Sequence, residues 1–160
     1  MWSPRLSDWR AVAPHANSVS DRVIATIEPV LTGLGAEQDP PCWIAWGDDP
    51  AARYTIIAIA DSGLALCSVR VMVPQEGPRA AGKLVRWNRV QVGELGVERQ
   101  AGHTVVNFQV EGQLLRGIDD EVGRVTEFAL DVFAGLDGRP FPSRAVAPKA
   151  SGARSHRSAS

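Results

Sequence analysis

Histidine and cysteine are the residues best suited to chemistry in this sequence, and there are few of them. The chain has 3 histidines, and only His103 falls inside a predicted folded region, next to Gly102 in a predicted hairpin turn. A nucleophilic site needs Ser, Cys or Thr beside a base that a third group orients. Nothing in the sequence surrounds His103 in this way. We therefore predict that the protein has no catalytic residues and is not an enzyme.

The two cysteines, Cys42 and Cys67, lie in apolar stretches with no second thiol or histidine at ligand spacing. A zinc site needs four ligands, which arrive most often as two close pairs. We predict that both cysteines are buried as small apolar side chains. A disulfide between neighbouring strands stays open as an alternative, but a reducing cytoplasm disfavours it. The sequence therefore predicts no metal and no cofactor.

Two other motifs have simple structural explanations. The pair Asp48-Asp49 belongs to a predicted turn, and Asp119-Asp120 precedes a predicted helix, where negative charge is favourable. The segment Gly93-Glu94-Leu95-Gly96 is not followed by the Lys-Ser/Thr of a phosphate-binding loop. None of these motifs indicates acid–base catalysis or nucleotide binding.

Length and composition are those of one globular domain. The chain has 160 residues, of which 44% are apolar and 22% charged, and its formal net charge is −1. No apolar run approaches the roughly 18 residues of a membrane span, and the N-terminus lacks the layout of a signal peptide. We expect a soluble, cytoplasmic protein, and we expect contact with nucleic acid only through the C-terminal tail.

The basic residues are unevenly distributed. Residues 143–160 contain Arg144, Lys149, Arg154 and Arg157 and no acid, which leaves 13 of the 17 basic residues and all 18 acidic residues elsewhere, a formal charge of −5. Such a segment cannot bury enough apolar surface to order itself. We predict an irregular leader over residues 1–17 that docks by its tryptophans, one domain over 18–139, and a disordered basic tail over 140–160. A solvated tail is favoured over one that contacts an anionic partner.

The hydrophobic pattern predicts the elements of this domain. A helix begins at Ser18–Asp21, with an expected kink or break at Pro29. Further elements follow in chain order: strands over 42–47, 54–61 and 64–73, a helix over 79–90, a strand hairpin over 94–100 and 104–112, and a helix from Asp119 to Leu136. The order α-β-β-β-α-β-β-α predicts an α+β fold with a five-stranded antiparallel sheet and helices packed mainly on one face.

Local features of this order resemble a bacterial family. The third strand ends at Val73-Pro74, a helix ends in Leu84-Val85-Arg86-Trp87-Asn88, a polar hairpin follows, and an acidic start opens the last helix. Over about residues 18–137 the chain resembles the YbjN-like proteins and the type III secretion chaperones. The resemblance implies a non-catalytic α+β binding module, often a homodimer, that holds an extended segment of a partner protein against apolar surface.

A sheet with helices on one face leaves the other face to be explained. The residues that we predict there as binding residues are Trp43, Met72, Trp87 and Phe108, because large exposed apolar side chains mark interaction sites. The alternative is that all four belong to the core. Two other binding classes stay open. A pleckstrin-homology-like lipid- or peptide-binding domain would need about seven strands before the last helix and a strand in place of the helix over 79–90. A nucleic-acid module could use Arg86 and Arg89 beside Trp87, but the charge of −5 opposes it.

Overall fold

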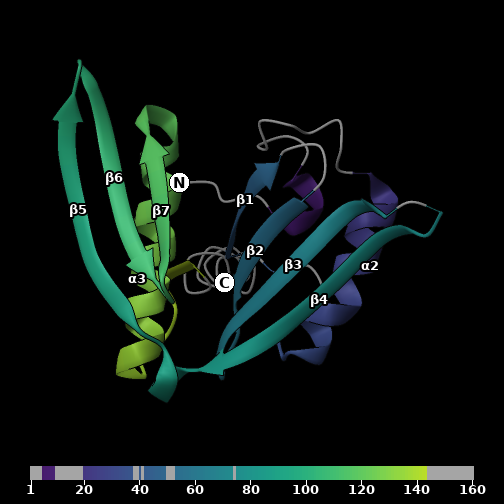
Figure 1. Ribbon diagram of the computed structural model, residues 1–160. Helices are drawn as coiled ribbons and strands as arrows, with labels where there is room; N and C mark the ends of the chain where they lie inside the picture. The colour runs from purple at the N-terminus through teal and green to yellow at the C-terminus, as the bar shows by residue number, and fades with distance from the viewer. Residues whose placement is uncertain are drawn as a thin grey trace, which may run out of the picture. The chain divides into compact units, whose positions relative to one another are not determined.

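The computed structural model describes residues 5–9, 20–37, 40, 42–49, 53–73 and 75–143, without the side chains of residues 47–49, 72 and 73 (Figure 1). The chain forms two compact units, Met1–Gln91 and Val92–Ser160. Each unit has its own antiparallel sheet and its own long helix. The predicted α+β class and the antiparallel pairing are confirmed, but the single five-stranded sheet is wrong. In the described part of the chain, seven strands form one sheet of four and one of three.

Unit 1 is a four-stranded sheet with one helix on one of its faces (Figure 1). Its strands lie in chain order: β1 (Trp43–Asp49), β2 (Arg53–Ile59), β3 (Gly63–Val73) and β4 (Gly77–Arg86). Helix α2 spans Asp21–Gly33, and its buried residues are Val23, Ile27 and Leu31. The Ser20 hydroxyl accepts a hydrogen bond from the Val23 amide at 3.4 Å, which caps the helix. The predicted helix is confirmed, and it continues through the exposed Pro29.

The core of unit 1 lies between α2 and the sheet and includes part of the N-terminal segment. Leu6 lies in a single 3-10 turn, η1 (Leu6–Asp8), and is fully buried. Trp9 is 2% exposed and contacts Trp43 and Tyr54 edge to face, at ring-centroid distances of 6.1 and 4.9 Å. The prediction that the leader docks by its tryptophans is confirmed for Trp9, while Trp2 lies outside the described residues.

The predicted helix over residues 79–90 is wrong. Residues Gly77–Arg86 form β4, and a 3-10 turn, η3 (Trp87–Arg89), follows. Tertiary contacts explain the difference, because β4 pairs with β3 along most of its length. Gly82 is the key position: a Cβ atom there would lie 2.6 Å from the Leu66 carbonyl oxygen and 3.0 Å from side-chain carbons of Val30 and Leu34. Glycine weakens a helix. In β4, the missing side chain of Gly82 instead lets α2 approach the strands closely.

Unit 2 is a three-stranded sheet with α3 (Val122–Asp137) packed against two of its strands. The strands are β5 (Val92–Gln100), β6 (His103–Val110) and β7 (Gln113–Ile118), with a 3-10 turn, η4 (Asp119–Glu121), before the helix. Phe108 of β6 contacts Phe133 of α3 at a centroid distance of 5.6 Å. The predicted hairpin and last helix are confirmed. Strand β7, which follows a second tight turn at Glu111-Gly112, was not predicted.

A buried carboxylate of α3 binds the segment that follows the helix. Gly138, with φ of 69°, ends the helix as predicted. Asp131 is fully buried and accepts hydrogen bonds from the backbone amide of Ser143, at 3.2 Å, and from its hydroxyl. The basic residues of the predicted tail lie outside the described residues, and the boundaries of leader, domain and tail stay a prediction. None of the described helices is long and apolar enough to cross a membrane.

Candidate functional site

Exposed large apolar side chains in the described part of the chain all belong to unit 2. They are Leu95 (37% exposed), Val97 (64%), Leu114 (58%), Ile118 (38%) and Leu130 (47%). Four of them lie on β5 and β7, which are the two edge strands of the sheet. Exposed apolar surface of this kind is common at sites of protein interaction. The edges of the three-stranded sheet are therefore the candidate binding surface.

Strand β5 is left uncovered by the helix of its own unit. Leu95 and Val97 pair in register with Phe108 and Val106 of β6, and both of those partners are buried. Helix α3 packs against β6 and β7 (Figure 1). The apolar side chains of β5 therefore extend the buried face of the sheet past the helix, where they stay exposed.

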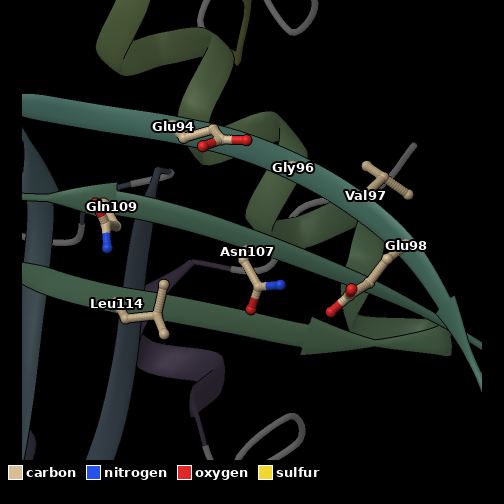
Figure 2. A pocket seen from close by; sticks show the side chains of 7 residues that line it. All are labelled: Glu94, Gly96, Val97, Glu98, Asn107, Gln109 and Leu114. Atoms are coloured by element: carbon tan, nitrogen blue, oxygen red, sulfur yellow. The ribbon is translucent and has the colours of Figure 1, made fainter.

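The opposite face of the same sheet is hollowed, because Gly96 has no side chain. The hollow has a volume of about 350 Å³ and is lined by Glu94, Gly96, Val97, Glu98, Asn107, Gln109 and Leu114. Figure 2 shows Glu94, Gly96 and Glu98 along β5, with Asn107, Gln109 and Leu114 on the neighbouring strands and Val97 pointing away. A Cβ atom on Gly96 would meet only the Glu94 carboxylate, at 3.9 Å. The volume is at the lower end of ligand pockets and suits one long side chain.

Two carboxylates border the hollow, and they differ in their hydrogen-bond partners. Glu94 forms no ion pair or hydrogen bond with a described side chain. Glu98 accepts a hydrogen bond from the side-chain amide Nε2 of Gln100 at 2.7 Å, and Oε1 of the same side chain accepts one from Arg116 at 3.1 Å. Arg116 thus reaches Glu98 only through Gln100. The hollow therefore offers carboxylate and amide oxygens to a cationic group.

The four residues predicted to bind a partner lie in different surroundings. Trp43 is 4% exposed and Phe108 fully buried, so a partner can reach neither unless the core opens. Trp87 is half-buried, and its indole N–H donates to the Asp61 carbonyl at 2.8 Å. The side chain of Met72 lies outside the described part of the chain. Phe108 belongs to unit 2 and the other three to unit 1, and their role in binding stays a prediction.

His103 has a carboxylate partner that the sequence did not indicate. Its Nδ1 lies 2.6 Å from Asp119 Oδ2, and the Thr104 amide donates to Asp119 Oδ1 at 3.1 Å. These hydrogen bonds, from His103 first and Thr104 second, hold the pKa of Asp119 below its usual value. In the described residues, no serine or threonine hydroxyl and no cysteine thiol is hydrogen-bonded to His103. The pair connects the start of η4 to the start of β6.

The cysteines behave as the sequence predicts. Both are buried and free, and burial raises the pKa of the Cys67 thiol to about 11. Among the described residues, no group of three His, Cys, Asp or Glu side chains could hold a metal ion.

Sequence reasoning did not select the residues of the hollow. The period of two in Glu94-x-Gly96-x-Glu98 was a usable signal, because it places both carboxylates and the gap between them on one face of a strand. The amides come from β6 and the leucine from β7, and β7 was absent from the predicted sheet.

No protein-family model, curated protein or solved structure matches this chain. The likeness to YbjN-like proteins and type III secretion chaperones therefore stays a prediction.

Proposed function

We propose that the protein is a non-catalytic binding module that holds an extended segment of a partner protein along β5. The proposal rests on the position of β5 and on the surfaces of its two faces. This strand is a nine-residue edge strand with uncovered apolar side chains on one face and the hollow on the other. An extended segment that pairs with β5 would satisfy its outward backbone groups and present alternate side chains to both faces.

The two faces of β5 favour different types of side chain in the bound segment. Side chains toward Leu95 and Val97 should be apolar, since they would bury surface that α3 leaves exposed. A side chain on the other face can cross β5 at Gly96 and enter the hollow. Glu94 and Glu98 lie on either side of that gap, so lysine or arginine is favoured there. The preferred segment is therefore an extended strand with apolar residues on one face and a basic residue on the other.

A second copy of the chain fits β5 poorly. Antiparallel pairing of two β5 strands about Gly96 would place Leu95 opposite Val97, which is favourable. The same register would place Glu94 opposite Glu98 twice, and like charges directly opposite each other destabilise a strand pair. We therefore assign β5 to a different protein. A homodimer, a bacterial origin and a cytoplasmic location all stay predictions.

A pleckstrin-homology-like lipid- or peptide-binding domain is the second candidate. That class needs about seven strands before its last helix and a strand in place of the helix over 79–90. The seven strands, with β4 at Gly77–Arg86 and α3 after β7, meet both conditions, whereas the class does not account for α2. We favour segment binding, because Leu95, Val97 and the hollow lie on a single edge strand.

The experiment uses a peptide built for the two faces. A nonapeptide with fluorescein on its N-terminus, Thr-Val-Thr-Val-Lys-Val-Thr-Val-Thr, is titrated with the full chain, and binding is followed by fluorescence anisotropy. Wild type should bind, and Gly96→Leu, which fills the hollow without a backbone clash, should bind at least about tenfold more weakly. Leu130→Ala, at an exposed leucine of α3, is the control and should bind like wild type. Equal binding by Gly96→Leu, or none by wild type, would refute the proposal.

A further inference from the structure

Three adjacent strands of unit 1 carry only basic charge. Strands β2, β3 and β4 contain Arg53, Arg70, Arg79, Lys83 and Arg86 and no aspartate or glutamate. Residues 1–142 are acidic as a whole, with a formal charge of −5. A basic surface on such a chain is not the result of overall composition.

The strand register gathers three of these residues into one row. Arg53 pairs with Arg70, and Arg70 pairs with Arg79. All three are exposed. Their chain neighbours Tyr54, Val69 and Ala80 belong to or pack against the core under α2, so the arginines lie on the face away from that helix. Cross-strand neighbours on one face have Cβ atoms about 4.5–5.5 Å apart.

Among the described side chains, one carboxylate forms an ion pair with this row. Arg79 forms an exposed ion pair with Glu76 at 2.8 Å, and Asp49 of β1 is the register partner of Arg53. Within the described part of the chain, Arg70 in the middle of the row forms no ion pair or side-chain hydrogen bond. Like charges directly opposite each other destabilise a sheet, and a bound anion would remove that repulsion.

We propose that the row Arg53–Arg70–Arg79 binds a phosphate group. A guanidinium donates two parallel N–H bonds to a phosphate, which makes arginine the preferred side chain for this ligand. The next row on the same face places Thr55 opposite Ser68, and both have hydroxyl donors. The row spans two strand spacings, about 10 Å, which suits one or two phosphates and is short for a nucleic-acid backbone. The phosphate could belong to a free metabolite or to a lipid headgroup.

The test uses inorganic pyrophosphate and the full chain in low-salt buffer. Isothermal titration should show binding to wild type and an affinity lower by about tenfold to a hundredfold for Arg70→Gln, the range expected for hydrogen bonds to a charged group. Arg116→Gln, an exposed arginine of unit 2, is the control and should bind like wild type. The melting temperature of Arg70→Gln in phosphate-free buffer should not be lower than that of wild type, which separates lost binding from lost folding.

The source of the phosphate is tested with phosphatidylcholine vesicles with or without phosphatidic acid. Co-sedimentation that depends on phosphatidic acid and is lost in Arg70→Gln supports a lipid headgroup. Pyrophosphate binding without vesicle binding supports a free phosphorylated ligand. The proposal is overturned if wild type does not bind pyrophosphate, or if Arg70→Gln binds it as wild type does. It does not depend on the β5 surface, because all its residues lie in unit 1.

Discussion

Gly82→Ala distinguishes the strand that the structure shows from the helix that the sequence predicts. In a helix interior, this change stabilises a protein by about 1 kcal/mol. In β4, the new methyl group would lie 2.6 Å from the Leu66 carbonyl oxygen and 3.0 Å from carbons of Val30 and Leu34. The carbonyl belongs to the backbone of the neighbouring strand, so it cannot rotate away. Overpacking of this kind destabilises by about 1–3 kcal/mol. The sign of the change in unfolding free energy therefore decides whether Gly82 lies in a helix or in a strand.

Tryptophan fluorescence during urea unfolding is a suitable assay, because all five tryptophans of the chain lie in unit 1. The control is Gly33→Ala at the last residue of α2, where an added Cβ meets nothing within 4 Å. It should stabilise unit 1 by up to about 1 kcal/mol. The reasoning is refuted if Gly82→Ala is as stable as wild type or more stable.

Two further predictions concern unit 2. His103→Ala should raise the pKa of Asp119 toward its ordinary value of 3.8, because the hydrogen bond from His103 is the main cause of the lowered pKa. Since the folded-state pKa is lowered, the contribution of this carboxylate to stability is present above about pH 4 and is lost as the pH falls through the folded-state pKa. An NMR pH titration of the Asp119 carboxyl carbon measures the shift, and an unchanged pKa in the variant would count against this assignment. Phe108→Ala should destabilise unit 2 by about 3–5 kcal/mol, because the ring is fully buried against Phe133; if amide hydrogen exchange in α3 stays as slow as in wild type, Phe108 is not the core residue described here.

The elements that could be predicted from the sequence are those with local signals. Helix α2 has a serine cap and an apolar stripe, the β5–β6 hairpin turns at Ala101-Gly102, and α3 stops at a glycine with positive φ. A helix is predicted over residues 79–90 because Ala81, Leu84 and Val85 fit helical spacing, whereas the structure has β4 at Gly77–Arg86. What makes this segment a strand is its pairing with β3 and the approach of α2 over Gly82. Both are tertiary contacts between segments far apart in the chain.

The candidate sites were harder to predict, because they depend on register. Aromatic residues such as Trp43 and Phe108 were chosen for their type, and the structure buries both. The hollow needs an absent side chain at Gly96 and lining residues from two other strands. The arginine row joins residues 17 and 9 positions apart, from Arg53 to Arg70 and from Arg70 to Arg79. No periodicity in a single segment shows such a pair.

Amide hydrogen exchange of β5 tests the central claim most directly. The full chain is compared with and without a saturating concentration of the lysine nonapeptide, and exchange is followed residue by residue with NMR. The account predicts that peptide slows the exchange of alternate amides of Val92–Gln100, those pointing away from β6, and leaves the amides of Gln113–Ile118 unchanged. Unchanged exchange throughout β5, or slowing confined to another strand, would contradict the assignment of this edge as the binding surface.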